Sequence, residues 1–592
     1  MNKETQRKWA EFALNAVNED FPDPQNTDNW KVCEELLGCA LECKESIVLY
    51  HIDTDIAAYL LNQTALYLQI KKSSYALALN LYLISLDINK KMFKEQHPNY
   101  ANSLSNIAEL HRVQGQYQDA LSLYKKILDI RKNTVGKQHL DYAQSLNNLS
   151  VTYENIGKYK QALSLCQEAL NIKRAILGEY HPDYATNLNN LAHLYYTQDD
   201  LDNALKLHQE TLDIRKQIFG TEHPSYAQSL NNLSGVYEVL GYYEKSIPLL
   251  QKALSINKRI LGEHHPEYSK NLHNLAYAYQ AQGKYAEALS LFNKALTTSE
   301  KIFGKFHLDY ATATRHIALL YKSQGQYDKA KHLIYQALNI YERILGKILH
   351  PDYAACYDYL ASIYRIQDNY EKALFFSEKS LEINQKVFGE LHSHYAQSLY
   401  GLADLYRHQG HYQQALPLLE KSLNITEQTV GKLHHRYATS LNSIAHIYQA
   451  LGKTEDAFSL FQAVLQIREQ VSGKQHPSYA QSLHNIAKLY REKGEYEKAL
   501  HFYKQALIVK ESIFGENHID CANTLNSIAL LYDDLGHYQK ALPLYQKSLS
   551  IFVNILGEEH SYTKKIQNNY EVCLKEYHEK IANEQGNAEK MG

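Results

Sequence analysis

Residues 223–264, HPSYAQSLNNLSGVYEVLGYYEKSIPLLQKALSINKRILGEH, form one complete copy of the pattern that decides the fold. Its opening histidine, in His-Pro-x-Tyr or a variant, recurs every 42 residues, and once after 43. The recurring histidines are His97, His139, His181, His223, His265, His307, His350, His392, His434, His476, His518 and His560. A fixed period of this size is typical of an array of identical supersecondary units. We expect eleven units over residues 97–559 and a degenerate first unit at 54–96.

Glycines mark two helix ends in each unit. With the histidine as position 1, position 40 is glycine in all eleven copies and position 19 in nine, with Asp199 and Asp368 as exceptions. Glycine after an apolar periodic run is typical of a helix C-terminus, because the next residue often needs a positive φ. Positions 8, 11, 12 and 15 follow the spacing of one helix face. Each unit is therefore predicted to contain two antiparallel helices, with small residues at positions 12 and 24 where they cross.

Stacking explains how such short units bury their apolar faces. The sequence predicts an all-α solenoid of antiparallel helix pairs, in which each unit contacts mainly its neighbours and unfolding is less cooperative than in a globular chain. Residues 1–53 are expected to form an N-terminal helical cap. Residues 560–592 are expected to form a C-terminal capping helix with a loose polar tail.

Composition excludes several functional classes. The 592 residues include 62 Lys+Arg and 65 Asp+Glu, for a formal charge of −3, which disfavours binding to nucleic acid. No stretch approaches the 18 apolar residues of a membrane-spanning helix, and the N-terminus has no apolar signal core. Seven scattered cysteines do not suggest a disulfide framework. We expect a soluble cytoplasmic chain with no membrane insertion.

The unit resembles a known repeat. Leu at position 8, Leu or Ile at 11, Ala or Ser at 12, Tyr at 15 and Ala at 24 resemble the tetratricopeptide repeat, lengthened to 42 residues. Tyr-Ala-x-Ser-Leu-Asn-Asn-Leu, at 142–149 and 226–233, resembles the kinesin-light-chain subtype of that repeat. This resemblance implies a right-handed superhelix whose first helices line a concave, protein-binding wall. Residues 8–68 resemble the helical segment before the repeats of bacterial STAND-type signalling ATPases, whose nucleotide-binding module is absent here.

These resemblances leave two main functions open. The first is a non-enzymatic scaffold or adaptor that binds a protein or an extended peptide in its concave groove. The second is a sensor or regulatory component of a bacterial STAND-like signalling or defence system, with the ATPase on another chain. An undetected hydrolase is a third possibility.

Motifs for catalysis are incomplete. Gly452-Lys453-Thr454 ends like a phosphate loop, but Ile447 occupies the place of its first glycine, so a helix end is the better interpretation. His578-Glu579 is followed by Ala582 where a zinc protease needs its second histidine. The sequence predicts no catalytic residue and no cofactor.

The recurring histidines raise the question of metal binding. Equivalent residues of stacked units lie roughly 10 Å apart, whereas ligands of one zinc ion each lie about 2 Å from it. A role at the helix start or in packing is therefore expected, and no metal site is predicted. Adjacent histidines could still bind metal weakly in a purified sample; these pairs are His264/His265, His392/His394 and His434/His435. Cys33, Cys39 and Cys43 share one helical stretch and are expected in the core.

Two sets of side chains are candidates for ligand contacts. Helical geometry places position 10 on the face opposite the core. It is asparagine in Asn106, Asn148, Asn190, Asn232, Asn274 and Asn485. An amide can hydrogen-bond a peptide backbone; alternatively, it solvates the surface or reaches a neighbouring helix. Position 16 carries the basic residues Lys322, Arg365, Arg407 and Arg491. These cations could contact an acidic ligand or interact with the helix C-terminus.

Overall fold

The computed structural model describes residues 2–558 and 560–591, with side chains described to residue 583. All regular secondary structure in this part of the chain is helical. Four α-helices and one 3₁₀ helix precede the first recurring histidine: α1 (Lys3–Asp20), η1 (Thr27–Asn29), α2 (Trp30–Tyr50), α3 (Asp55–Ile70) and α4 (Tyr75–Phe93). None of the described helices is both long and apolar enough to cross a membrane.

Each 42-residue unit then forms two antiparallel helices. The first helices are α5 (Pro98–Val113), α7 (Leu140–Asn155), α9 (Pro182–Thr197), α11 (Pro224–Val239), α13 (Pro266–Ala281), α15 (Leu308–Ser323), α17 (Pro351–Ile366), α19 (Ser393–His408), α21 (His435–Ala450), α23 (Pro477–Glu492) and α25 (Ile519–Asp534). The second helices are α6 (Tyr117–Thr134), α8 (Tyr159–Leu177), α10 (Leu201–Phe219), α12 (Tyr243–Ile260), α14 (Tyr285–Phe303), α16 (Tyr327–Leu345), α18 (Tyr370–Phe388), α20 (Tyr412–Thr429), α22 (Thr454–Ser472), α24 (Tyr496–Phe514) and α26 (Tyr538–Leu556). The predicted all-α array of paired helices is confirmed.

The recurring histidine caps the first helix of its unit. Nδ1 of His181 accepts a hydrogen bond from the backbone N–H of Asp183 at 3.1 Å, and the same bond occurs at each of the twelve histidines. It satisfies one of the N–H groups that a helix start leaves unpaired. The expected role at the helix start is therefore confirmed.

Small residues let the two helices of a unit approach closely. In the unit of α13 and α14, Ala276 and Ala288 are completely buried, together with Phe292. The helix end at position 19 needs a positive φ, which is 74° at Gly452 and 59° at Asp199. Gly452 thus separates α21 from α22, as expected for a helix end.

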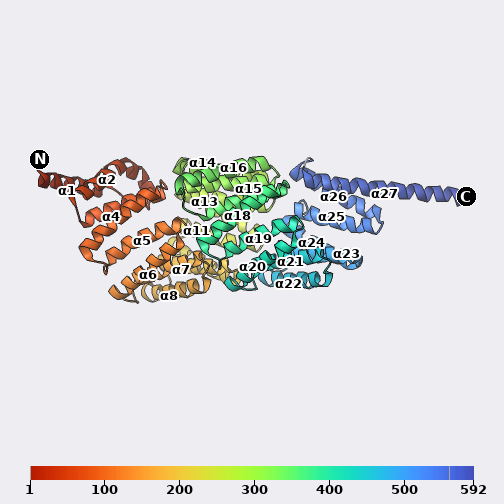
Figure 1. Cartoon of the computed structure of the whole chain (residues 1–592), viewed down its shortest axis with the longest axis horizontal. Coiled ribbons are helices and arrows are strands. Elements are labelled where there is room, and N and C mark those ends of the chain that lie inside the picture. The colour runs from red at the N-terminus through yellow and green to blue at the C-terminus, as the bar shows by residue number, and fades with distance from the viewer. Residues whose placement is uncertain (1, 559, 592) are drawn as a thin grey trace.

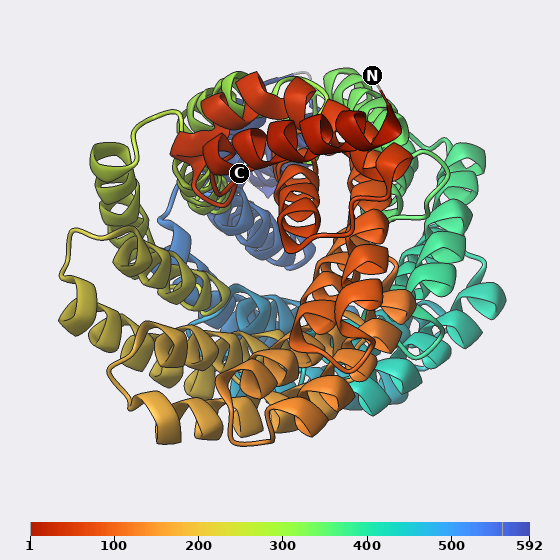
Figure 2. The same cartoon turned by 90° about the vertical axis from the view of Figure 1, so that its left-hand side faces the viewer.

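The array winds into a superhelix whose successive turns are in contact. Viewed down the long axis, the helix pairs form a ring in which α1 and α2 lie beside α14–α16 (Figure 2). Trp30 packs on Phe303 with ring centroids 5.7 Å apart. One buried apolar cluster includes residues of α1–α5 and of α14–α17. The first units are therefore in contact with units six repeats later, as well as with their sequence neighbours.

The capping histidines also make these contacts between superhelical turns. Because Nδ1 accepts the capping bond, the neutral ring carries its proton on Nε2. Nε2 of His350 donates to the carbonyl oxygen of Val113 at 3.1 Å, and Nε2 of His476 to that of Val239 at 2.7 Å. Each histidine thus joins the start of its own helix to the end of a first helix 237 residues earlier.

The last helix, α27 (Ser561–Met591), extends past the other helices at the C-terminal end of the molecule (Figure 1). Ile566 and Cys573 are buried against the last repeat. The backbone of the expected loose tail continues this helix. Residue 559, where the last unit is predicted to end, lies outside the described residues, as do residue 592 and the side chains of 584–591.

Candidate functional site

A cavity of about 690 Å³ lies between two turns of the superhelix. Residues of α7, α9 and α11 line one side of it, and residues at the ends of α17, α18 and α19 line the other. The second side belongs to the next superhelical turn, so the cavity exists only because the two turns are in contact.

Two of the predicted asparagines, Asn190 and Asn232, line this cavity. Their side-chain amides are not isolated. Nδ2 of Asn190 donates to Oδ1 of Asn147 at 2.9 Å, and Nδ2 of Asn232 donates to Oδ1 of Asn189 at 2.7 Å. In both pairs position 10 bonds to position 9 of the preceding unit, so the amides connect neighbouring repeats.

The other predicted asparagines lie elsewhere. Asn485 repeats the ladder with Asn442 at 2.9 Å, and Asn106 bonds Asn62 at 3.4 Å. Asn148 instead accepts from Gln144 of its own helix at 2.9 Å, and Asn274 lines a separate cavity of about 360 Å³. The alternative that the amide reaches a neighbouring helix thus describes four of the six residues. A role in peptide binding stays a prediction.

The cavity also contains buried polar atoms that have no hydrogen-bond partner among the described residues. These atoms include Oδ1 of Asn231 and Nδ1 of His208. The exposed fractions of the two residues are 7% and 3%. Burial lowers the pKa of His208 to about 4, and the charges of His193 and Arg215 act in the same direction, so its ring is neutral at pH 7. Such atoms favour a polar ligand.

Charges in the cavity are paired. Arg112 donates two hydrogen bonds to Glu109, at 2.8 and 2.6 Å. Nε2 of His193 lies 3.4 Å from Oε1 of Glu154, and burial raises the pKa of Glu154. The wall has no excess of one charge, which disfavours a strongly acidic or basic ligand in this cavity.

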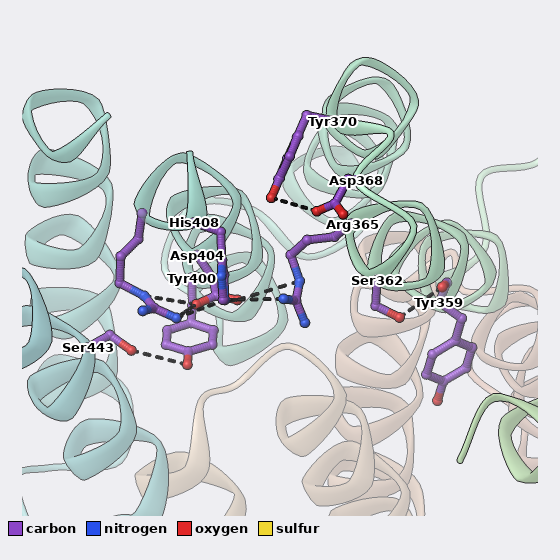
Figure 3. Close-up of polar contacts among 10 residues, drawn as sticks. Tyr359, Ser362, Arg365, Asp368, Tyr370, Tyr400, Asp404, His408 and Ser443 are labelled. Atoms are coloured by element: carbon purple, nitrogen blue, oxygen red, sulfur yellow. Dashed lines mark hydrogen bonds and ion pairs between the residues drawn. The ribbon is translucent and has the colours of Figure 1, made fainter. Parts of the chain in front are cut away.

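The predicted basic residues at position 16 do not line this cavity. Figure 3 shows Arg365 directed at Asp404 and His408 of α19. Nη2 of Arg407 lies 2.6 Å from Oδ1 of the same aspartate. Arg491 forms an ion pair with Asp534. Each of the three arginines therefore has an acidic neighbour, although Arg365 and Arg407 share one aspartate.

Lys322 is the fourth of these basic residues. Burial lowers the pKa of Lys322, and the charge of Arg365 lowers it further. Contacts of all four residues with an acidic ligand stay a prediction, with less free charge than the sequence suggested.

A further set of cations was missed by the sequence analysis. At position 35, near the end of the second helix of a unit, buried cations reach into the following unit. Arg131 donates to the carbonyl oxygen of Asp141 and to Oγ of Ser145, both at 2.9 Å. Arg215, Arg468 and Lys510 make equivalent contacts with the following unit. Lys173, also at position 35, donates instead to Gln144 of its own unit. Because these cations recur at one position of the repeat, contacts between units could have been predicted from them.

Of the three N-terminal cysteines expected in the core, Cys33 and Cys43 are buried and Cys39 is exposed. Nε1 of Trp30 donates to the carbonyl oxygen of Pro24 at 2.8 Å and holds the turn before α2. This segment packs on the repeats and contributes nothing to the cavity.

The sequence profile of the tetratricopeptide repeat matches most of the chain. The matched segments are residues 55–133, 104–175, 141–217, 183–241, 225–301, 269–343, 352–428, 436–512 and 505–554. The chain therefore belongs to the tetratricopeptide repeat family.

Two solved structures of nearly identical TPR-like repeats, assigned to a kinesin light chain of Podosopora anserina, are 26% identical to this chain. Each match covers 35% of this chain and 97% of the solved chain, with a TM-score of 0.30. BtubC (BKLC) from P. vanneervenii is 22% identical and covers 44% of this chain and 93% of its own, with a TM-score of 0.32. No curated protein matches the chain.

Proposed function

We propose that the chain is a non-enzymatic scaffold or adaptor that binds an extended segment of a partner protein in the 690 Å³ cavity. Tetratricopeptide repeats commonly mediate protein binding. The observation that carries the proposal is the pair of amides at Asn190 and Asn232, whose Nδ2 atoms are held by the preceding repeat. Among the described residues, no hydrogen bond is made to their Oδ1 atoms, which can accept from a peptide N–H.

The spacing of these two amides selects the backbone conformation of the ligand. Equivalent positions on stacked helices lie roughly 10 Å apart. In a polyproline II helix, residues three apart point the same way and are separated by about 9.3 Å. Asn190 and Asn232 would therefore bind N–H groups three residues apart on such a segment.

Hydrogen bonds alone do not supply the affinity. Two of them contribute roughly 1–3 kcal/mol net, whereas micromolar binding needs about 8 kcal/mol. Aromatic side chains also line the cavity: Tyr117 of α6 stacks on Phe388 of the opposite wall at 5.5 Å, and Tyr159 is contributed by α8. Phe388 and Tyr159 are each only 8% exposed, so much of the apolar surface buried on binding must belong to the ligand; about 200 Å² in total would add about 5 kcal/mol.

The second candidate function is that of a sensor or regulatory component in a STAND-like signalling system, with the ATPase on another chain. The 42-residue period and the Tyr-Ala-x-Ser-Leu-Asn-Asn-Leu segments support a repeat of the kinesin-light-chain subtype. The motifs in residues 8–68, which form α1–α3, support a sensor component of a STAND-like system. A gene for a nucleotide-binding ATPase beside this one, and co-purification of its product, would favour that candidate.

The direct experiment fills the cavity. Gly235 is a helical glycine of α11 that lines the cavity, and an added Cβ would meet no atom within 4 Å. Gly235→Phe places a ring in that space while it removes a helix-weakening glycine. Gly401→Phe is the matched control, because Gly401 is also helical and open but lies outside the cavity.

The probe is a peptide selected on the parent protein from a random displayed library, and the readout is fluorescence polarisation. Gly235→Phe is expected to abolish binding, and Gly401→Phe to leave the dissociation constant unchanged. Equal affinities of the two variants would place the binding site elsewhere.

A further inference from the structure

Two exceptions to the repeat pattern meet at one contact between superhelical turns. Asp199 occupies position 19, which is glycine in nine of the eleven units. His435 occupies position 2, which is proline in six. The two residues are 236 positions apart in sequence, yet Oδ2 of Asp199 lies 2.5 Å from Nδ1 of His435. At the equivalent contact of the preceding unit, Gly157 faces His392.

A third ligand group completes the cluster. Nε2 of His434 lies 3.6 Å from Oδ2 of Asp199. One carboxylate oxygen and two imidazole nitrogens all lie within 4.8 Å of one another. The side chains of Asp199 and His434 are 6% and 2% exposed, whereas that of His435 is 55% exposed. The cluster is therefore buried on one side and open to solvent on the other.

From this geometry we propose that Asp199, His434 and His435 bind a divalent transition-metal ion of the zinc class, which ties two superhelical turns together. Two imidazoles and a carboxylate suit Zn²⁺ or Co²⁺ far better than Mg²⁺. The open side leaves room for water as a fourth ligand. Asp199 has a φ of 59°, a conformation that favours glycine.

Binding has an identifiable cost. Nδ1 of His434 accepts the capping bond from the backbone N–H of Arg436. The ring N–H at Nε2 donates to the backbone of Thr197. Coordination through Nε2 breaks that bond and moves the ring proton to Nδ1, so the capping bond is lost as well. The charge of Arg436 also opposes a cation, and His476 is a further titratable group near the cluster. The ionised carboxylate offsets these effects: burial alone would raise the pKa of Asp199, but the hydrogen bond from His435 and the two imidazoles lower it.

The chain supplies a matched control. Asp368 is the other aspartate at position 19, with a φ of 55°, and its carboxylate accepts a hydrogen bond from the hydroxyl of Tyr370 at 3.2 Å (Figure 3). No histidine pair lies beside it in the part of the chain that the structure describes. Asp199→Gly and Asp368→Gly therefore each remove an aspartate with a positive φ at position 19. Only Asp199→Gly also removes a proposed ligand.

The experiment titrates Zn²⁺ into the chelator-treated full chain by calorimetry and records Co²⁺ absorption and thermal unfolding in parallel. The parent and Asp368→Gly are expected to bind one ion tightly, with a tetrahedral Co²⁺ spectrum and a higher melting temperature. Asp199→Gly is expected to bind at least about tenfold more weakly, since even the loss of an outer-shell partner costs about 10–100-fold. Weak binding by other histidine pairs is common to all three proteins and cancels. Equal zinc affinity and equal Co²⁺ spectra in Asp199→Gly and the parent would overturn the proposal.

Discussion

Nδ2 of Asn232 donates a hydrogen bond to Oδ1 of Asn189 at 2.7 Å, and this bond joins two neighbouring repeats across the floor of the cavity. The bond changes what a substitution at position 10 should do. A side chain that only faced the groove could be removed without cost. A side chain that satisfies the neighbouring amide cannot.

The first prediction concerns stability. Asn190→Ala leaves Oδ1 of the buried Asn147 without its donor, and Asn485→Ala does the same to the partly buried Asn442. Each should lower the free energy of unfolding by about 1–3 kcal/mol. Asn148→Ala should cost less, because that amide only accepts from Gln144 on its own helix. Urea unfolding measures the free energy of unfolding of each variant. An equal decrease in all three variants would contradict the role of the asparagine ladder.

The second prediction concerns the contact between superhelical turns. A Cβ at Gly157 would lie 2.8 Å from Cδ2 of His392, whereas one at Gly452 would meet nothing within 4 Å. Both glycines have a positive φ, 72° and 74°, so alanine costs about 1–3 kcal/mol at each. Only Gly157→Ala should also separate the turns, which small-angle scattering would show as a larger radius of gyration. Identical scattering by the two variants would argue against a closed superhelix in solution.

The third prediction concerns the crossing of the paired helices. Ala288 is completely buried between α13 and α14, so Ala288→Leu should cost roughly 1–3 kcal/mol by overpacking. Ala286→Leu, at an exposed position of the same helix, is the control and should be nearly neutral. Denaturant unfolding measures both. A stable Ala288→Leu variant would mean that the crossing is looser than described.

The fourth prediction concerns pH. Burial raises the pKa of Glu238 from 4.5 to about 7, against a smaller lowering by the hydrogen bond from Ser246. The folded-state pKa lies above the unfolded one, so the folded protein is favoured while the Glu238 carboxyl is protonated. This contribution to the free energy of unfolding is fully present below pH 4.5 and is lost as the pH rises through about 7. Glu238→Gln should match the parent at low pH and exceed it by on the order of 1–3 kcal/mol above pH 7.

Unfolding measured across this pH range tests that prediction. Glu244→Gln, an exposed glutamate on α12, controls for the loss of one negative charge. A difference between Glu238→Gln and the parent that does not vary with pH would contradict the assignment.

The fifth prediction concerns the C-terminal end. Deleting residues 584–592 should leave the melting temperature almost unchanged, because the buried residues of α27, among them Ile566 and Cys573, are retained. Deleting residues 560–592 exposes the apolar surface that they cover and should reduce solubility. Equal behaviour of the two truncations would contradict a capping role for α27.

Much of this fold was accessible from the sequence. The histidine, glycine and alanine positions gave the helix pairs and their crossings, because those depend on residues within one 42-residue period. The contact of Trp30 with Phe303 was not accessible. It depends on small rotations between units that add up over six repeats and leave no mark in any single one. The expectation of contacts mainly between neighbours was therefore incomplete, and unfolding should be more cooperative than in an open array.

The candidate site was predictable only in part. Asn190 and Asn232 were named from their position on the helix, but their bonds to position 9 were not foreseen, since two adjacent asparagines do not show which faces the groove. The opposite wall, with Phe388 and His392, comes from the next superhelical turn and could not be assigned from the local pattern.

The most direct test of groove binding is a titration of one library-selected peptide against the parent, Asn190→Ala with Asn232→Ala, and Asn485→Ala. All variants lose ladder bonds, but only the double variant loses groups that line the cavity. The account predicts that the double variant binds about 5 to 150 times more weakly, the equivalent of about 1–3 kcal/mol, at low and high salt alike. Asn485→Ala should bind like the parent. Unchanged affinity for the folded double variant, or an equal loss in Asn485→Ala, would contradict it.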